Sequence, residues 1–415
     1  MSKKILIVGN GANVYALAKK LSLNNEIYVA PGNKLMKDFA TVVDIREEAV
    51  AELLDFAMET GIDLTIPVSE KTVLSELASI FNSHDQQVFA PSFQASKKIF
   101  DKAIMKKILY KLRIPTPKFG IFEKQNMALD YIKNTKVPFV IKSNEKSSAV
   151  VLTSLTSAKS IIDSFFSVQN QKVIIEDYLW GTPFSFYALT DGYKALPIVS
   201  SIMYKHSLEG EGGQLTAGMG ACIPNYKLSI DNEYFLMDNV VYPLIEYLEK
   251  DGNPYMGVLG VNGILSEDGN IQILGFNSFF QDADSDAILN IIDADLYSLF
   301  ESCVIGSFSD EVDFIPQKDL SYTSVVLACK NKENIQNSIY GLDNICDETS
   351  ISFYPTVTKN RYLEYEANYG SVLVITSSGR TATTATKNVY EDLDCLKFKG
   401  IYYRKDICKP QREHV

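Results

Sequence analysis

The chain has 415 residues, of which 46% are hydrophobic and 22% are charged, and its formal net charge is −11 at pH 7. This length exceeds the size at which one hydrophobic core keeps growing, so we expect two to four packed domains. A pI near 5.0 argues against broad nucleic-acid binding, which needs clustered lysine and arginine. The sequence contains no run that could span a bilayer, and its N-terminus enters a strand by Lys4 without a signal-peptide pattern. We therefore expect a cytoplasmic protein with no membrane partner.

Cysteine and histidine usage indicates no structural zinc site and no catalytic triad. The six cysteines show no CxxC spacing, which argues against a structural zinc site and a disulfide framework, so we expect reduced and mostly packed thiols. They are Cys222, Cys303, Cys329, Cys346, Cys395 and Cys408. The three histidines, His84, His206 and His414, lie far apart in the sequence, and each is expected on the surface or in packing.

An α/β domain with a mainly parallel sheet is expected at the N-terminus. The stretch KKILIVGNGANVYALAKKL predicts a buried strand, a glycine turn and an amphipathic helix. Further short strands alternate with helical patterns such as EEAVAELLDFAMETG, and the domain is expected to end near Pro91. These strands are expected at residues 27–30, 41–45, 63–68 and 87–90.

The turn GNGANVY allows three interpretations. As a dinucleotide fingerprint it is weak, because Val14 occupies the position of the third glycine and the next strand ends in APGN without an acid for a ribose. A strand–glycine–helix turn can also hold a phosphate through free N–H groups at the start of the helix. A purely structural tight turn explains the pattern equally well.

The middle of the chain predicts one basic helix and then short strands. The helix SKKIFDKAIMKKILYKLRIP is stopped by Pro115, and the strand in KVPFVIKS ends at Lys142. A glycine-rich stretch, residues 208–221, is expected to be a surface loop close to a ligand or to backbone. The remaining predicted elements are strands at 147–154, 173–181 and 184–192 and a helix at 157–166. The last two strands are expected to join at Gly181.

The last third predicts a helix, a hairpin and a small α+β domain. The helix covers residues 231–250, and two strands, 257–265 and 270–276, meet at an Asp268-Gly269 turn. From Ser321 onward, strands (YTSVVLAC and YGSVLVITS) and one helix (TATTATKNVYEDL) are expected.

The stretch IQILGFNSFFQDADSD, residues 271–286, is the first candidate site. A buried strand ends at Asn277, and Asp282, Asp284 and Asp286 follow within ten residues, which predicts an oxygen-rich rim suited to a hard cation such as magnesium. Gly275 lies beside Asn277 where the two-residue strand period would place a second ligand, and it offers none.

Lysines and an acidic strand end are the second candidate site. Lys102, Lys106 and Lys142 are by default solvated charges. Lys142 is the exception, because it ends an alternating apolar strand and is a reasonable phosphate contact. The segment EDYL, residues 176–179, could present backbone groups to an adenine, although a plain strand exit explains it equally well.

Eight short motifs occur in a specific order along the chain. They are IVGNG (7–11), YVAPGN (28–33), DLTI (63–66), IPTP (114–117), VIKS (140–143), TAGMGA (216–221), FN (276–277) with Asp282, and YRKDI (403–407). With the order of elements, they resemble an ATP-grasp ligase and, more narrowly, the glycinamide ribonucleotide synthetase (phosphoribosylamine-glycine ligase) family. The resemblance implies an α/β ATP-grasp ligase architecture with an N-terminal Rossmann-like (pre-ATP-grasp) domain (1–101), a split ATP-grasp domain (102–318) and a small C-terminal α+β domain (319–415).

The resemblance also implies an activity. The family uses ATP and Mg²⁺ to phosphorylate the carboxylate of glycine, and phosphoribosylamine then attacks the acyl phosphate, a ligation in purine biosynthesis. We expect small-molecule substrates and a monomer or homodimer. By position, the ATP-binding residues are Lys102, Lys142, Glu176, Asp177 and Leu179, the metal ligand is Asn277, and the substrate-binding residues are Gly9, Gly11, Asn33, Thr216, Gly218, Met219, Gly220 and Asp282, with no catalytic residue assigned.

Departures from the family pattern all remove charge or flexibility. The family's glycine-rich phosphate loop is replaced by NEKSSAVV (144–151), and the metal-ligand glutamate by Gly275. Candidate replacements for the lost acid are Glu209, Glu211, Asp282 and Asp284. Other losses are an Arg-Glu-His run (here Asn13, Val14 and Tyr15), two acids after the hinge glycine (Thr182 and Pro183), an Asp-His pair (Met203 and Tyr204) and an arginine (Phe279). We therefore expect weak or altered ligase activity, the alternative being a non-catalytic family member that binds a nucleotide, a metabolite or a protein partner.

Overall fold

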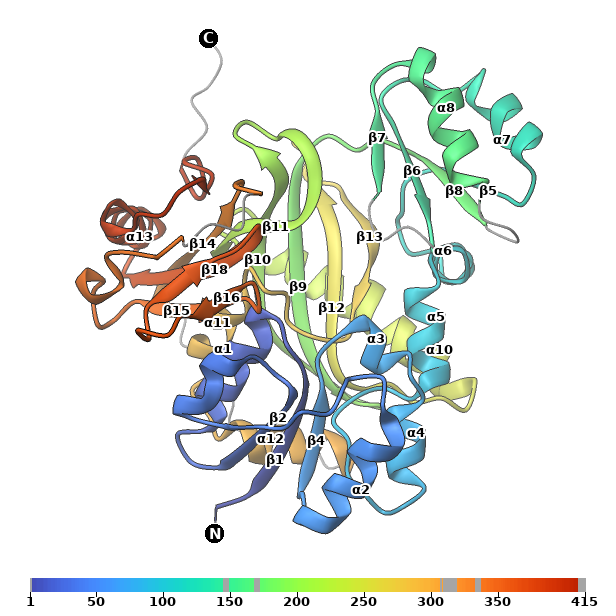
Figure 1. Cartoon of the computed structure of the whole chain (residues 1–415). Coiled ribbons are helices and arrows are strands. Elements are labelled where there is room, and N and C mark those ends of the chain that lie inside the picture. The colour runs from blue at the N-terminus through green and yellow to red at the C-terminus, as the bar shows by residue number, and fades with distance from the viewer. Residues whose placement is uncertain are drawn as a thin grey trace.

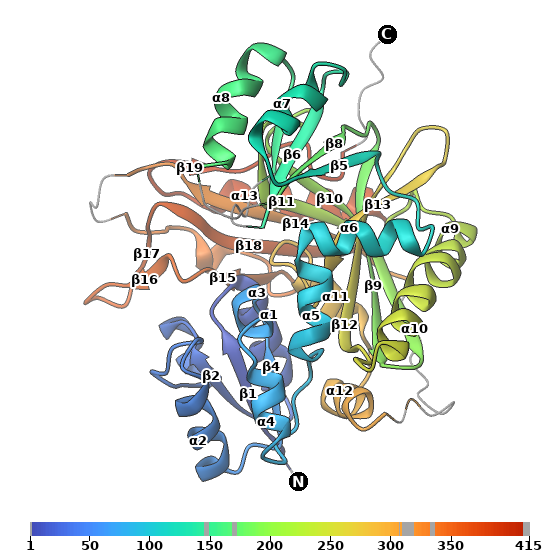
Figure 2. The same ribbon diagram turned by 90° about the vertical axis from the view of Figure 1, so that its right-hand side faces the viewer.

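The computed structural model describes residues 2–144, 149–167, 172–306, 308, 319–332 and 337–409. His414 and residues 145–148 of the segment expected to replace the phosphate loop lie outside the described residues. The chain forms an N-terminal α/β unit, a large central sheet and a smaller sheet, called the lid below, that projects from the body (Figure 1). The N-terminal unit and the lid lie at opposite ends of the molecule in both ribbon views (Figure 2).

The N-terminal sheet confirms the predicted parallel arrangement. Its order is β3-β2-β1-β4, and every neighbouring pair is parallel. The predicted strand at 87–90 instead forms an isolated bridge between Val88 and Thr65. The elements are β1 (Lys4–Gly9), α1 (Ala12–Leu21), β2 (Glu26–Pro31), the 3-10 helix η1 (Lys34–Asp38), β3 (Thr41–Val42), α2 (Val50–Thr60), β4 (Leu64–Pro67), α3 (Glu70–Val73) and α4 (Leu77–Asn82).

The basic helix predicted before Pro115 is two helices, α5 (Phe93–Phe100) and α6 (Lys102–Lys111). Asp101 between them has an extended backbone, and its carboxylate accepts hydrogen bonds from the N–H groups of Ala103 and Ile104. The aspartate therefore ends one helix and caps the next, which is the usual role of this residue type at an N-cap. The single-helix prediction was wrong because the helical period continues across this cap.

The lid is a four-stranded sheet in the order β5-β8-β6-β7. Two helices, α7 and α8, pack on the sheet and bury an apolar core that includes Phe139, Ile162 and Phe165. The elements are β5 (Phe119–Phe122), α7 (Gln125–Ile132), β6 (Phe139–Ser143), β7 (Val150–Leu152), α8 (Leu155–Phe165) and β8 (Val173–Asp177).

The central sheet has nine strands, in the order β13-β12-β9-β10-β11-β14-β18-β15, with β19 paired to β14. Its strands are β9 (Thr182–Asp191), β10 (Ala195–Leu208), β11 (Gly212–Ile223), β12 (Met256–Leu265), β13 (Ile271–Asn277), β14 (Ser321–Cys329), β15 (Ser350–Phe353), β18 (Gly370–Gly379) and β19 (Ile401–Tyr402). The predicted hairpin is confirmed as β12 and β13, with Gly269 at a positive φ in the turn. This sheet contains strands from both sides of residue 318, where the predicted ATP-grasp and C-terminal domains divide. The predicted division into three domains stays a prediction.

The predicted glycine-rich loop, residues 208–221, is mostly the strand β11. It pairs with β10 through two irregular registers, and Gly213 and Gly218 within it adopt positive φ, as does Gly210 in the turn before it. The loop prediction was wrong because Gly213 and Gly218 bend a continuing strand instead of ending it.

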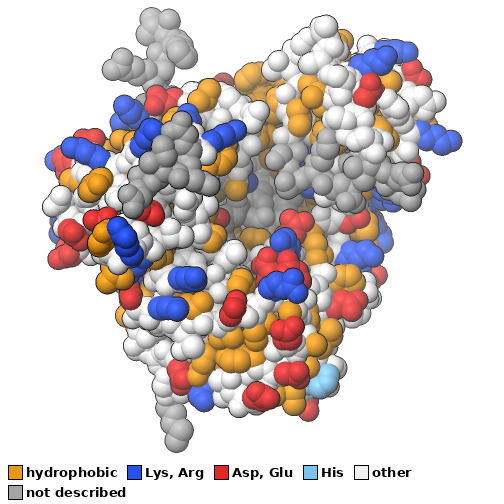
Figure 3. Space-filling model, in the orientation of Figure 1, with side chains coloured by type: hydrophobic (Ala, Val, Ile, Leu, Met, Phe, Trp, Pro, Cys, Tyr) orange, Lys and Arg blue, Asp and Glu red, His pale blue; other side chains and the backbone are white. Residues whose placement is uncertain are grey.

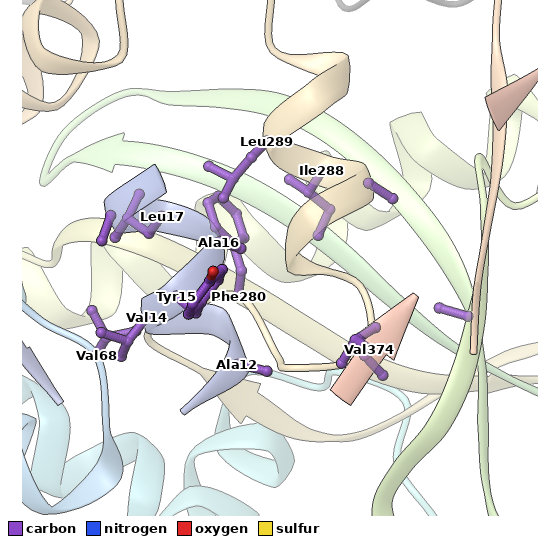
Figure 4. Packing of buried hydrophobic residues seen from close by; sticks show 14 of the residues in the cluster. Ala12, Val14, Tyr15, Ala16, Leu17, Val68, Phe280, Ile288, Leu289 and Val374 are labelled. Atoms are coloured by element: carbon purple, nitrogen blue, oxygen red, sulfur yellow. The ribbon is translucent and has the colours of Figure 1, made fainter. Parts of the chain in front are cut away.

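Helices cover the central sheet and join it to the N-terminal unit. A buried cluster fills the contact between α1 and α11, and Leu17, Ile288 and Leu289 all belong to it (Figure 4). The helices are α9 (Ile230–Leu236), the π-helical turn η2 (Met237–Val241), α10 (Tyr242–Lys250), α11 (Ser285–Ile291), α12 (Leu296–Val304) and α13 (Ala382–Cys395), and the remaining short elements are η3 (Leu342–Asn344), β16 (Val357–Lys359) and β17 (Tyr365–Ala367). Within the described residues, we find no helix with the length and apolar character that a membrane crossing requires.

One cysteine pair contradicts the expectation of reduced thiols. Cys222 on β11 and Cys408 near the C-terminus form a disulfide, with their Cα atoms 5.5 Å apart and a sequence separation of 186. The other four cysteines are free thiols, and Cys303 and Cys329 among them are buried as predicted. A pair so distant in sequence has no local spacing signal.

Candidate active site

A cavity of about 360 Å³ lies where the lid meets the β12–β13 hairpin and the β10–β11 hairpin. It is lined by all five predicted ATP-binding residues, Lys102, Lys142, Glu176, Asp177 and Leu179, and by the predicted metal ligand Asn277. The structure therefore brings the lysines and the 176–179 segment of the second candidate site next to Asn277 of the first. The elements that carry them, α6, β6, β8 and β13, are far apart in sequence. Charges of both signs are interspersed on the face of the molecule shown in Figure 3, with no single basic patch.

A buried ion cluster forms the floor of this cavity. The Lys106 ammonium lies 2.8 Å from Glu176 Oε2, and the Lys142 ammonium contacts Glu176 Oε1. Lys106 also donates to Thr116 Oγ1 at 2.7 Å. The expectation that Lys106 is solvated was wrong, since its side chain is 1% exposed. Both lysines are held by one carboxylate, which makes burial of three charges tolerable.

The pKa values in the cluster follow from burial and mutual charge. Burial opposes ionisation of Glu176, but the charges of Lys142 and Lys106 outweigh it and hold the pKa of Glu176 below its usual value. Burial lowers the pKa of Lys106, and the charge of Glu176 works against that shift. Because its oxygens are engaged by two lysines, the Glu176 side chain supports the cavity.

Lys102 and Lys205 complete the positive charge around the cavity. The Lys102 ammonium donates to the backbone carbonyl of Ser143 at 2.6 Å, at the end of β6. Lys205 on β10 lines the cavity, and burial lowers its pKa while the nearby Asp284 raises it. Sequence reasoning missed Lys205, whose signal is one lysine directly after the apolar part of a strand. His206, expected on the surface or in packing, also lines the cavity.

The three aspartates after Asn277 do not form the predicted rim. Asp284 and Asp286 are buried, and Asp282 contacts the N-terminal unit instead. Asp284 accepts hydrogen bonds from the Tyr187 hydroxyl at 3.0 Å and the Ser201 hydroxyl at 3.1 Å, and burial raises its pKa to about 7. Burial raises the pKa of Asp286 to about 6. The rim prediction was wrong because α11 begins at Ser285 and turns these side chains into the core.

Asp282 occupies the start of α1, the position where a phosphate was considered. Its Oδ1 accepts a hydrogen bond from the Asn13 N–H at 2.9 Å, and the Asn13 side chain donates to the Phe280 carbonyl. Burial raises the pKa of Asp282, and the N–H groups of Asn13 and Ala12 oppose that shift. Among the three interpretations of the GNGANVY turn, this contact favours a structural turn, because a carboxylate already takes the helix N-terminus.

The other predicted substrate residues lie outside the lining of the cavity. Gly11 is close to Asp282 Oδ1, and Gly218 lies against Ala283. Asn33 is buried and donates to the Phe353 carbonyl, and Thr216 donates to the Lys205 carbonyl. Gly9 ends β1, and Met219 and Gly220 lie on β11. Their substrate-binding role stays a prediction.

The position expected to hold magnesium has few oxygen donors. Gly275 pairs with Asn262 across the hairpin, and Asn262 Oδ1 accepts hydrogen bonds from Ser185 and Gln281 at 2.7 and 3.1 Å. Asn277, the predicted metal ligand, is a neutral side chain with its Nδ2 atom buried and unpartnered among the described residues. In the described part of the chain, no group of three or more His, Cys, Asp or Glu residues could hold a metal. This position therefore offers one neutral side-chain oxygen, that of Asn277, so a magnesium ion bound here with a nucleotide would take most of its ligands from phosphate oxygens.

Two family models match consecutive parts of the chain. The "Phosphoribosylglycinamide synthetase, N domain" model matches residues 3–97, and the "Phosphoribosylglycinamide synthetase, ATP-grasp (A) domain" model matches residues 100–285. The chain belongs to the phosphoribosylglycinamide synthetase family. The resemblance and the ATP-grasp fold class inferred from the sequence are thereby confirmed.

Family relatives cover nearly the whole chain. A protein named phosphoribosylamine--glycine ligase from Caldanaerobacter subterraneus is 28% identical over 97% of this chain and 99% of its own. One of the same name from Halalkalibacterium halodurans is 29% identical over 97% and 96%. The phosphoribosylamine--glycine ligase structure from Thermotoga maritima matches with a TM-score of 0.80 at 21% identity, over 97% and 99% of the two chains. The biotin carboxylase domain of Hydrogenobacter thermophilus 2-oxoglutarate carboxylase, solved with MgADP, matches with a TM-score of 0.73 at 14% identity, over 97% and 92%.

Proposed function

We propose that this protein is an ATP-dependent carboxylate-amine ligase of the phosphoribosylamine-glycine type, acting in purine biosynthesis with a slowed phosphoryl-transfer step. The observation that carries the proposal is the cavity, which joins Lys102, Lys142 and Lys205 to the 176–179 hinge in a chain that matches these ligases over nearly its whole length. Two of its cations, Lys102 and Lys142, were predicted as phosphate contacts, and Lys205 adds a third.

The reaction proposed is the one that the family name describes. The terminal phosphoryl group of ATP passes to the glycine carboxylate and ADP leaves. The phosphoribosylamine nitrogen then attacks the acyl phosphate, the new C–N bond forms, and phosphate leaves, with one proton lost from the nitrogen. In this scheme Lys102, Lys142 and Lys205 bind and neutralise the phosphate oxygens, which is how positive groups favour phosphoryl transfer.

Magnesium is the weak part of this scheme. The family and its MgADP-bound neighbour imply magnesium with the nucleotide, yet Gly275 and Asn277 provide one neutral donor between them. Loss of a metal contact that contributes ~4 kcal/mol to the transition state slows turnover roughly 1,000-fold. We therefore expect the ligation of glycine to be slower than in relatives that have an acid at this position.

A second candidate function is nucleotide binding without ligation. The observation that favours it is the environment of Gly275, where a hydrogen-bonded set of Ser185, Asn262 and Gln281 lies next to the expected metal position. The predicted small-molecule ligand is the same in both candidates, and the lysine-lined cavity is the common binding site.

Two measurements separate these candidates. ATP at 100 times its dissociation constant adds about 2.7 kcal/mol to the free energy of unfolding, so the melting temperature should rise by a few degrees with ATP. ADP release is then measured with glycine and phosphoribosylamine, with each substrate omitted in turn. Slow ADP release that needs both substrates supports the ligase. A melting shift without substrate-dependent ADP release supports nucleotide binding alone, and no shift contradicts both.

A further inference from the structure

Glu211 is a strained residue at the tip of the β10–β11 hairpin. It lines the cavity, and its backbone has a φ of 57°, in the left-handed region that non-glycine residues rarely adopt. Such a conformation costs about 1–2 kcal/mol relative to the usual helical or extended regions. A residue held in this state by its surroundings is a candidate for function.

Arg404 provides the surroundings that hold Glu211. Its guanidinium donates to Glu211 Oε1 at 2.7 Å, to both oxygens of Asp406 and to the His206 carbonyl at 3.1 Å. The Arg404 side chain is 1% exposed, and it stacks on the Tyr204 ring. The hairpin tip is fixed further by the Gly210 N–H, which donates to Asp406 at 2.9 Å. The C-terminal segment thus holds one glutamate oxygen at the cavity.

The second oxygen of Glu211 has no hydrogen-bond partner. Glu211 Oε2 is buried, and within the described residues no group donates to it. Glu211 and Tyr178 line the same cavity, and the charge of Glu211 raises the pKa of the Tyr178 hydroxyl, after the larger effect of burial. A buried carboxylate oxygen without a partner is unfavourable, and a ligand in the cavity can supply the missing hydrogen-bond donor.

The two side chains after the hinge glycine supply no carboxylate for a ribose. The Thr182 hydroxyl is a hydrogen-bond partner of the Lys227 ammonium at 2.9 Å, and Pro183 lines the cavity without a polar side chain. A nucleotide whose base lies at residues 177–179 has its ribose hydroxyls within the next few ångströms, and an acidic side chain is the common partner of a ribose 2′-hydroxyl.

We propose that Glu211, positioned by Arg404, accepts hydrogen bonds from the ribose hydroxyls of the bound nucleotide. This inference rests on the proposed function only in requiring a nucleotide in the cavity. It makes Glu211 a specificity residue that selects ribonucleotides over deoxyribonucleotides. Arg404 is a positioning residue, because it touches Glu211 and not the ligand.

The test uses the full chain and its single tryptophan. Trp180 is 71% exposed and stacks edge-on against Tyr178, so its fluorescence should report ligand at the hinge. Dissociation constants are measured for ATP, 2′-deoxy-ATP and 3′-deoxy-ATP. Since a hydrogen bond to a charged group is worth roughly 10- to 100-fold in affinity, the wild type should bind ATP that much more tightly than at least one deoxy analogue.

Variants assign the discrimination to Glu211. Glu211→Ala should lose it, with ATP binding falling to the level of the deoxy analogue, and Arg404→Lys should reduce it. Glu209→Ala, at the same hairpin tip and outside the cavity lining, should retain it. Melting temperature confirms that each variant is folded, and Glu211→Gln is a second variant of nearly unchanged size.

Three outcomes overturn the inference. If the wild type binds ATP and both deoxy analogues equally, the inference fails while nucleotide binding stands. If Glu211→Ala weakens all three nucleotides by the same factor, Glu211 acts on the phosphates or the fold instead of the ribose. If no nucleotide binds, both the inference and the proposed function fail.

Discussion

The Lys106 ammonium lies 2.8 Å from the Glu176 carboxylate, and each of these side chains is 1% exposed. Glu176 also holds Lys142, so Glu176→Gln leaves two cations facing each other without an anion. We expect this change to lower the free energy of unfolding by about 3–5 kcal/mol, the usual effect of leaving a buried charge uncompensated. Lys106→Met should cost less, because Glu176 keeps Lys142.

Urea denaturation at neutral pH measures this order. The control is Lys133→Met, which breaks an exposed pair with Asp130 and should change stability by less than about 1 kcal/mol. If Glu176→Gln proves no worse than Lys133→Met, the cluster does not stabilise the fold in the way described.

Gly275→Glu should increase the ligation rate. A Cβ atom at this position meets, among the described atoms, the Met105 side chain at an ordinary 3.6 Å, so a longer side chain can enter the cavity. The new carboxylate would add the missing oxygen ligand beside Asn277. We expect ADP release with both substrates to rise by roughly 100-fold, and magnesium to increase the melting temperature of the ATP complex further than in the wild type.

Gly275→Gln is the matched control for that experiment. It has the same size as glutamate but no charge, so it should leave the rate and the magnesium response near those of the wild type. If both substitutions raise the rate of ADP release equally, the gain comes from filling the cavity and not from the carboxylate.

Asp284→Asn should change how stability depends on pH. The pKa of Asp284 is about 7 in the fold, against 3.8 for the unperturbed group, because the carboxyl is buried. Between pH 4 and 7 the folded state keeps a proton that the unfolded state loses, so this group makes the wild type less stable as pH rises. Asparagine does not titrate, so the variant should gain on the wild type by up to about 1.4 kcal/mol per pH unit in this window.

Melting curves from pH 4.5 to 8 follow that difference, and Asp55→Asn on the exposed side of α2 is the control. The gap between Asp284→Asn and the wild type should widen up to pH 7 and then stay constant. A gap that is the same at pH 4.5 and pH 8 would contradict the raised pKa.

Lys205→Met should weaken ATP binding. Lys205 lines the cavity on β10, and methionine keeps much of its apolar stem while removing the charge. A charge-assisted hydrogen bond to a phosphate is worth about 1.5–3 kcal/mol, so we expect a roughly 10- to 100-fold higher dissociation constant for ATP. Adenosine, which has no phosphate, should bind both proteins alike in the same Trp180 fluorescence assay.

Local signals carried most of the secondary structure. The parallel strands β1, β2 and β4, the β12–β13 hairpin at Gly269 and the helix α13 were predictable because apolar period and turn chemistry act within a few residues. The break at Asp101 had a signal too, since aspartate is a strong N-cap, but the continuing helical period hid it. The motif order was also sufficient to indicate the family.

The burial of side chains was decided by the tertiary structure alone. A lysine or an aspartate has the same local signal in solvent and in a core, so neither Lys106 nor Asp284 could be assigned to the interior from its neighbours in sequence. The disulfide of Cys222 with Cys408 and the contact of Glu211 with Arg404 join residues almost two hundred positions apart.

The sequence by itself therefore determined the order of elements, the family and the loss of an acid at Gly275. The tertiary structure decided which charges face the cavity, because that depends on how β10, β13 and the C-terminal segment pack around it. Packing of distant segments sets burial, and burial sets both the ion pairs and the pKa values on which any chemistry at this site depends.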